Sequence, residues 1–287
     1  MALSKSTVST TSHEPEAHIP EPALEWDTLD LTVEGVSIEL ATVTRFGPLS
    51  PILFLHGFGG TKEDYIDIAL NPTFAGRSFI LYDSPGSGAS TCSDFSKVSI
   101  PFLVSLAQAV LNHFKIRRYH LVGHSMGGLT GLLLAEGNSA VLSFVNIKGN
   151  LAPEDCFLSR QIVDYPDSDP EKFMEQFILR TKLSSYYSAA LYATSLRYKV
   201  QPSVVKPTFA SMVEISDSKP LLSIFESLPI PKMYMFGEQY KSLTYLPRLA
   251  DAGIELAMIP SSGHFVMYSN PVAMWERIAA SVGRAGE

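Results

Sequence analysis

Apolar and polar positions alternate near the start of the chain and then give way to short, uniformly apolar runs. Residues 24–43 (LEWDTLDLTVEGVSIELATV) alternate on either side of Glu34-Gly35, which is typical of a β-hairpin. Strands buried on both faces are instead apolar throughout, so the later runs predict a parallel sheet covered by helices. These runs are 51–57, 78–83, 119–125, 141–147, 232–237 and 254–260.

Helix-like segments separate the apolar runs. Residues 100–116 carry apolar side chains three to four positions apart, and 126–138 follow the third run without a linker. Strands that alternate with helices form right-handed βαβ units. The expected fold class is therefore α/β, a mostly parallel sheet with helices on both faces.

The alternation stops after Asn150 and resumes near residue 229. The segment 151–228 has little strand character and is too long for an ordinary connection, so we predict an inserted helical cap. The α/β core then comprises 24–150 and 229–287. Residues 1–23 are rich in Ser, Thr, Glu and Pro, which predicts a flexible tail.

The composition of the chain argues against several classes of binding partner. The net charge of -7 and the absence of a Lys/Arg run argue against nucleic acid. Cys92 and Cys156 are the only cysteines, too few for a disulfide framework and wrongly spaced for zinc. No run approaches the roughly 18 apolar residues of a membrane span, and the first residues lack the apolar segment of a signal peptide. We expect a cytoplasmic protein without a membrane partner, and the sequence leaves open whether it forms a homodimer.

The pattern Gly123-His124-Ser125-Met126-Gly127 matches G-x-S-x-G between a predicted strand and a predicted helix. A strand that turns abruptly into a helix holds the central serine in a strained conformation, so side chains two positions away would collide. The turn also puts the hydroxyl at a helix N-terminus, where the helix dipole favours negative charge. Ser125 is therefore the candidate nucleophile.

Two loops supply partners for this serine. His56-Gly57-Phe58-Gly59-Gly60 follows a predicted strand, and the amides of Phe58 and Met126 are candidates for an oxyanion hole. We interpret His56 as a residue that orients this loop. His264 lies in a Gly-Ser loop just after the last predicted strand, where ligands meet an open α/β sheet, and is the candidate base.

The set HGFGG, LYDSPGSGAS, GHSMGG and SGHF, in this order and spacing, resembles the α/β-hydrolase superfamily over about residues 24–282. The resemblance implies Ser125 as nucleophile, His264 as general base and acid, and the Phe58 and Met126 amides as oxyanion hole. It implies no cofactor, and the sequence carries no metal cluster or cofactor fingerprint. A serine nucleophile argues against the epoxide hydrolases and haloalkane dehalogenases of this superfamily, which use aspartate.

The carboxylate that should orient His264 is not at either customary position of the superfamily. Tyr240 stands at the position of the usual aspartate, and Lys148 stands where some relatives carry a glutamate. Three alternatives remain: Glu238, with its long side chain one residue after Gly237, a residue of the neighbouring loop, or no acid at all. The loop candidates are Asn150, Glu154 and Asp155.

Two classes of function follow. The first is a serine hydrolase that cleaves an ester or lactone, or the C–C bond of a diketone-like substrate, in a small apolar molecule through an acyl-enzyme. The second is a small-molecule receptor or a non-hydrolytic biosynthetic enzyme on the same fold. The intact Ser125, glycine loop and His264 favour the hydrolase, whereas Lys148 and the missing aspartate favour the alternative.

Overall fold

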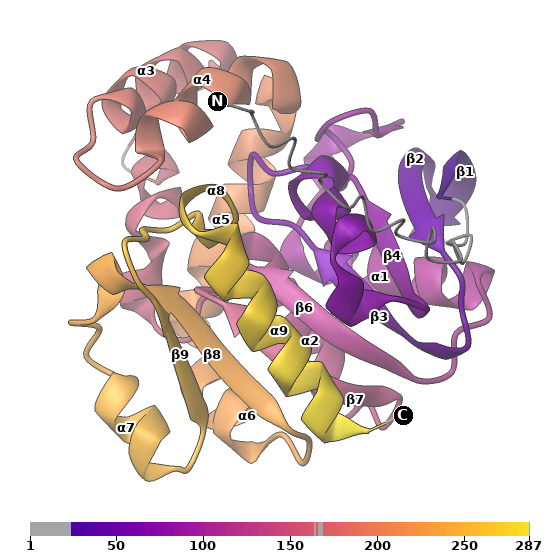
Figure 1. Ribbon diagram of the computed structural model, residues 1–287. Coiled ribbons are helices and arrows are strands. Elements are labelled where there is room, and N and C mark those ends of the chain that lie inside the picture. The colour runs from indigo at the N-terminus through magenta and orange to yellow at the C-terminus, as the bar shows by residue number, and fades with distance from the viewer. Residues whose placement is uncertain (1–23, 164, 166–168, 287) are drawn as a thin grey trace, which may run out of the picture.

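The computed structural model describes residues 24–163, 165 and 169–286, so the predicted tail 1–23 lies outside the described residues. Within them, one nine-stranded sheet has the order β1-β2-β4-β3-β6-β7-β8-β9, with β5 paired to β2. Figure 1 shows these strands side by side, with β1 and β2 at one edge and β9 at the other. The strands are β1 (Glu25–Val33), β2 (Val36–Arg45), β3 (Leu49–Leu55), β4 (Arg77–Tyr82), β5 (Thr91–Cys92), β6 (Tyr119–His124), β7 (Val141–Ile147), β8 (Lys232–Gly237) and β9 (Glu255–Ile259).

Strand direction follows the burial pattern of the sequence. The alternating segment forms the antiparallel β1–β2 hairpin, whose turn residues Glu34 and Gly35 both have positive φ, as a two-residue hairpin turn requires. Each uniformly apolar run forms a strand within two residues of its expected bounds. From β4 through β9 along the sheet these strands pair in parallel. The predicted α/β fold class is confirmed.

Helices cover both faces of the sheet. On one face, α2 packs against β6 and β7 and also touches α1 and α6. On the other, α9 crosses in front of the sheet in Figure 1, and its Trp275 indole donates to Asp67 of η1. The core helices are η1 (Lys62–Leu70), η2 (Pro72–Phe74), η3 (Phe95–Lys97), α1 (Ile100–His113), α2 (Met126–Ala135), η6 (Glu238–Tyr240), α7 (Leu246–Asp251), α8 (Val266–Ser269) and α9 (Pro271–Ala285).

In its described part, the segment between β7 and β8 consists of helices joined by loops, with one isolated β-bridge between Val200 and Ser87. Figure 1 shows α3 and α4 above the sheet edge near α8, and Phe173 and Phe177 of α3 pack edge-on against Phe209 of α5. The division into core and cap at 151–228 stays a prediction. Its helices are η4 (Pro153–Phe157), η5 (Ser159–Ile162), α3 (Pro170–Lys182), α4 (Ala189–Lys199), α5 (Pro202–Ser218) and α6 (Leu221–Ser227).

Across the residues that the structure describes, helices are too short or too polar to reach from one side of a bilayer to the other.

Candidate active site

Ser125 sits at the junction of β6 and α2 with φ 52° and ψ -116°. Its amide donates to the carbonyl of Ile147 at the end of β7. A Cβ on Gly123 would lie 2.3 Å from the Gly127 carbonyl oxygen, and one on Gly127 would lie 2.0 Å from the Leu55 carbonyl oxygen. The junction therefore admits only glycine at both positions, as the sequence predicts, and the half-buried Ser125 is held in a left-handed conformation that costs about 1–3 kcal/mol.

The glycine loop after β3 touches this junction. A Cβ on Gly57 would lie 2.5 Å from His124 Nδ1 and 3.1 Å from the Ser125 Cβ. Phe58 lines the same cavity as Ser125. Met126 is the first residue of α2, so its N–H has no acceptor within the helix. The structure thus brings the two candidate oxyanion residues to the nucleophile.

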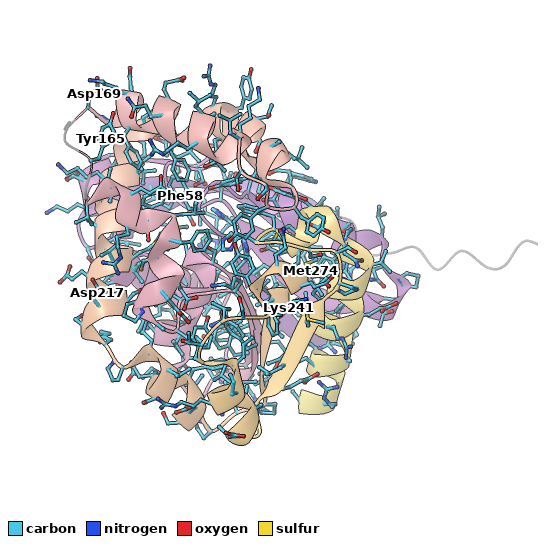
Figure 2. The ribbon with its side chains drawn as sticks, turned by 90° about the vertical axis from the view of Figure 1, so that its left-hand side faces the viewer. Phe58, Tyr165, Asp169, Asp217, Lys241 and Met274 are labelled. Carbon is cyan, nitrogen blue, oxygen red and sulfur yellow. The ribbon has the colours of Figure 1, made fainter. Side chains whose placement is uncertain are left out.

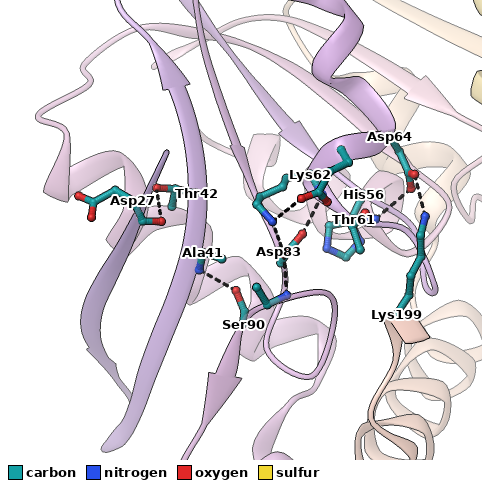
Figure 3. Close-up of polar contacts among 12 residues, drawn as sticks. Asp27, Ala41, Thr42, His56, Thr61, Lys62, Asp64, Asp83, Ser90 and Lys199 are labelled. Atoms are coloured by element: carbon teal, nitrogen blue, oxygen red, sulfur yellow. Dashed lines mark hydrogen bonds and ion pairs between the residues drawn. The ribbon is translucent and has the colours of Figure 1, made fainter. Parts of the chain in front are cut away.

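Both ring nitrogens of His56, which is labelled in Figure 3, form hydrogen bonds with the backbone. Its Nδ1 donates to the carbonyl of Gly57, and its Nε2 accepts from the amide of Ser84, both at 2.8 Å. Lys62 forms a buried ion pair with Asp83, 2.8 Å from Nζ to Oδ2, which fastens the start of η1 to the end of β4. The interpretation of His56 as a loop-orienting residue is confirmed.

His264 follows β9 and lies at the same cavity as Ser125. It is only 6% exposed. Its backbone carbonyl accepts a 2.8 Å hydrogen bond from His124 Nε2, so the residue before Ser125 positions the loop that carries His264. The rings of Phe157 and Phe265 pack edge-on against the imidazole, with centroids 5.4 Å and 4.9 Å away.

Burial controls the charge of both histidines. It lowers the pKa of His264 well below its ordinary value, and the proximity of His124 and Lys148 lowers this pKa further. Burial also lowers the pKa of His124 to about 4, despite the hydrogen bond to the His264 carbonyl. Both rings are neutral at pH 7, which is the state that a general base requires.

Among the described residues, none accepts a hydrogen bond from His264 Nδ1, although this atom is buried. Glu238, the predicted acid, is turned elsewhere: its Oε2 accepts from the amide of Ser261 at 3.0 Å. The assignment of Glu238 as the acid is therefore corrected. Its position directly after β8 directs the side chain along the Ser261 turn, and the carboxylate holds the histidine loop by its backbone.

The three loop candidates are also occupied by other partners. Asn150 donates to Cys156 and Ser216, and Glu154 accepts from the backbone and side chain of Thr244. Asp155 lines the cavity, but its carboxylate accepts from Lys148 Nζ, Tyr245 Oη and two backbone amides.

Lys148 and Tyr240 occupy the two customary acid positions and lie against each other. The Lys148 ammonium is 1% exposed, pairs with Asp155, and lies 4.9 Å from the centre of the Tyr240 ring. Tyr240 in turn lies 6.0 Å from the imidazole of His264, centre to centre. A buried cation, an aromatic ring and a paired aspartate thus replace the single carboxylate of a triad.

Tyr192 of α4 lies in the wall of the same cavity as Ser125. Its hydroxyl donates to the carbonyl of Phe58 at 2.9 Å, and its ring stacks on Phe265 with centroids 4.0 Å apart. One residue of α4 therefore contacts both the glycine loop after β3 and the neighbour of His264. No local sequence signal marks this role, because Phe58 lies 134 positions away.

The described residues contain no group of three or more His, Cys, Asp or Glu side chains that could hold a metal ion.

A strained serine at a strand–helix junction, an adjacent glycine loop and a histidine after the last strand define an α/β-hydrolase. Residues 50–219 match the alpha/beta hydrolase fold family, and the chain belongs to that family.

Individual relatives are distant. A 2-succinyl-6-hydroxy-2,4-cyclohexadiene-1-carboxylate synthase of Klebsiella pneumoniae is 24% identical over 236 residues, 78% of this chain and 90% of the relative. A mutant of the N-acyl homoserine lactonase AidH is 13% identical with a TM-score of 0.70, over 92% of this chain and 98% of that one. A carboxylesterase of Nitrososphaera gargenis is 16% identical with a TM-score of 0.68, over 90% and 98%. The two structural similarities establish the fold.

Proposed function

We propose that the protein is a serine hydrolase that cleaves an ester or lactone of a small apolar molecule through an acyl-enzyme on Ser125. The observation that carries the proposal is the shared cavity of Ser125, Phe58 and His264 beside a strained nucleophile at a helix N-terminus. The remaining walls are mostly apolar, including Phe209, Met212 and Leu158, which suits an uncharged reacting group.

The residues divide the reaction as follows. Ser125 Oγ attacks the ester carbonyl carbon while His264 takes its proton, and the Phe58 and Met126 amides stabilise the oxyanion. Collapse breaks the bond to the leaving oxygen, which takes the proton from His264. Water then repeats the sequence on the acyl-enzyme and releases the acid.

His264 performs this work without a carboxylate partner. The tautomer that accepts a proton at Nε2 leaves the buried Nδ1–H without an acceptor, which costs about 1–3 kcal/mol. The nearby Lys148 also disfavours the imidazolium that forms during attack. Because loss of the orienting aspartate's function lowers kcat about 10⁴-fold in a full triad, we expect turnover to be slow.

The alternative is a receptor or a non-hydrolytic enzyme that uses the same cavity. The buried Lys148–Asp155 pair favours it, since the acid positions have been converted to another structure. The Klebsiella relative is also named as a synthase.

Release of p-nitrophenol from p-nitrophenyl acetate tests the proposal. We expect measurable turnover for the wild type and background rates for Ser125→Ala and His264→Ala. Glu238→Gln is the matched control: the amide keeps an acceptor oxygen for Ser261, so turnover should stay within about twofold.

A wild type that is no faster than Ser125→Ala in both burst and steady state would overturn the hydrolase proposal and favour the receptor or synthase. A loss of orders of magnitude in Glu238→Gln would restore Glu238 as the acid.

A further inference from the structure

The cavity at Ser125 is too small for a substrate as it stands. About 20 Å³ in it is open to a water molecule, and one water needs roughly 10–15 Å³ on this measure. An ester can therefore reach Ser125 only if a wall of the cavity moves.

Phe157 is the wall best able to move. It ends the short helix η4 and is 38% exposed, whereas the other large aromatic walls, Phe58, Tyr192 and Phe209, are at most 7% exposed. Swinging the Phe157 ring outward costs little buried apolar area, while moving any of the others would open the core.

A larger groove lies on the outer side of Phe157. Its volume is about 550 Å³, and Phe157 and Leu158 line both the groove and the inner cavity. Its surface is mainly apolar, and Tyr186 also lines it. Another lining residue, Tyr165, is labelled in Figure 2, above and to the left of Phe58.

The groove has one formal charge among its described lining residues. Arg180 of α3 lines it, and the lining residues that the structure describes include no aspartate or glutamate. The guanidinium donates through Nε to Gln161 Oε1 at 3.0 Å, and the described ion pairs do not include it. Two Nη groups held in a fork are suited to a carboxylate.

We propose that Phe157 is a gate between the catalytic cavity and this groove. The groove then binds the alcohol arm of an ester, and Arg180 binds a carboxylate at the far end of that arm. The inference deepens the proposed function and rests on it. The acyl part stays small because Phe58, Phe209 and Met212 enclose it.

The arm in the groove is the leaving alcohol because of where His264 lies. The leaving oxygen must receive its proton from His264, and the ring that packs against His264 on the groove side is Phe157, 5.4 Å away. The alcohol therefore passes Phe157 as it extends outward.

Two acetate esters test the charge. We would measure kcat/KM for 6-acetoxyhexanoate and for its neutral analogue 6-acetoxyhexanamide. An exposed ion pair is worth up to about 1 kcal/mol, so the wild type should prefer the acid by about fivefold. Arg180→Gln should bring this ratio close to one. Lys182 is an exposed cation at the end of the same helix and lies outside the groove, so Lys182→Gln should leave the ratio unchanged.

A larger side chain at residue 157 tests whether Phe157 is the gate. Phe157→Trp should lower the ratio of kcat/KM for 6-acetoxyhexanamide over methyl acetate by several-fold, because a larger ring obstructs a long arm more than a methyl group. Leu183→Trp, at a site 78% exposed and outside the groove, is the control for the added indole.

The inference would be overturned if the ratio of kcat/KM for the acid over the amide were near one in the wild type. It would also be overturned if Arg180→Gln left this ratio unchanged. Ser125-dependent turnover of both esters would still support the proposed function in either case. If no ester is turned over, the proposed function fails, and the groove is judged by binding. Ser125→Ala should then bind 6-acetoxyhexanoate with a dissociation constant about fivefold lower than that of Ser125→Ala/Arg180→Gln. Equal dissociation constants in the two titrations would overturn the inference.

Discussion

Lys148 and Asp155 form an ion pair that is almost completely withdrawn from water. Tyr245 donates a further hydrogen bond to Asp155 and shares another with Tyr234, so the carboxylate is fully engaged. A pair of this kind adds little net stability over apolar side chains, but breaking it leaves an uncompensated buried charge.

We expect Lys148→Met to lower the free energy of unfolding by about 3–5 kcal/mol, because Asp155 would remain buried without its cation. The double variant Lys148→Met/Asp155→Asn should recover part of the loss, since the amide is uncharged. Urea unfolding followed by circular dichroism measures both.

The exposed Lys241 (Figure 2) provides the comparison: Lys241→Met should change the unfolding free energy by no more than about 0.5 kcal/mol. Equal effects of the two methionine substitutions would show that the buried pair does not behave as the structure indicates.

At the scale of elements, α4 does more than cover the core. Tyr192 holds the Phe58 carbonyl, and Lys199 at the end of the helix binds Asp64 of η1 and the hydroxyl of Tyr268 in α8. Figure 3 shows Lys199 reaching Asp64 from the neighbouring helix. The helix thereby fixes the glycine loop and the histidine loop relative to each other.

Tyr192→Phe should lower kcat for p-nitrophenyl acetate about three- to tenfold with little change in KM. The lost hydrogen bond is worth about 0.5–1.5 kcal/mol, and it positions an amide that acts mainly on the transition state. Steady-state kinetics measures kcat and KM separately.

Tyr198→Phe serves as the control, because Tyr198 lies on the same helix and is 85% exposed. A change in KM alone, or a kcat equal to that of the wild type, would assign Tyr192 a purely structural role.

The elements differ in how far the sequence predicts them. The parallel strands and α2 follow from uniform apolar runs and from glycines that tolerate close approach, which are local signals. The role of Lys148 is not local: its partner Asp155 lies on the following helix η4, and its contact with Tyr240 depends on how β7 and β8 pair. The sequence shows that a carboxylate is missing at two positions but not that Glu238 turns to Ser261.

At the scale of the whole molecule, two buried neutral histidines make stability depend on pH. The unfolded chain binds a proton at each histidine below a pKa of about 6.5, whereas folded His124 stays neutral down to about 4. The unfolded state therefore binds more protons, and the free energy of unfolding falls as the pH falls from about 6.5 to 4. His264, with its pKa also lowered, acts in the same direction.

Between pH 7 and 5, His124 should account for about 2 kcal/mol of lost stability. His124→Gln retains an N–H donor for the His264 carbonyl and has no titrating group, so its stability should fall by about 2 kcal/mol less than that of the wild type over this range. Urea unfolding at the two pH values checks this difference.

A parallel loss of stability in both proteins would mean that His124 is protonated in the folded state, contrary to its burial.

The Lys148–Asp155 pair also determines which substitutions the site can accept one at a time. Exchanging Lys148 for glutamate would restore a carboxylate at a customary acid position, but it would put two anions side by side in the interior, with their only cation gone. Asp155 would have to lose its charge first, and that step leaves Lys148 buried alone. Either order of these two substitutions at positions 148 and 155 thus passes through a variant with an uncompensated buried charge, so the ion pair resists replacement one residue at a time.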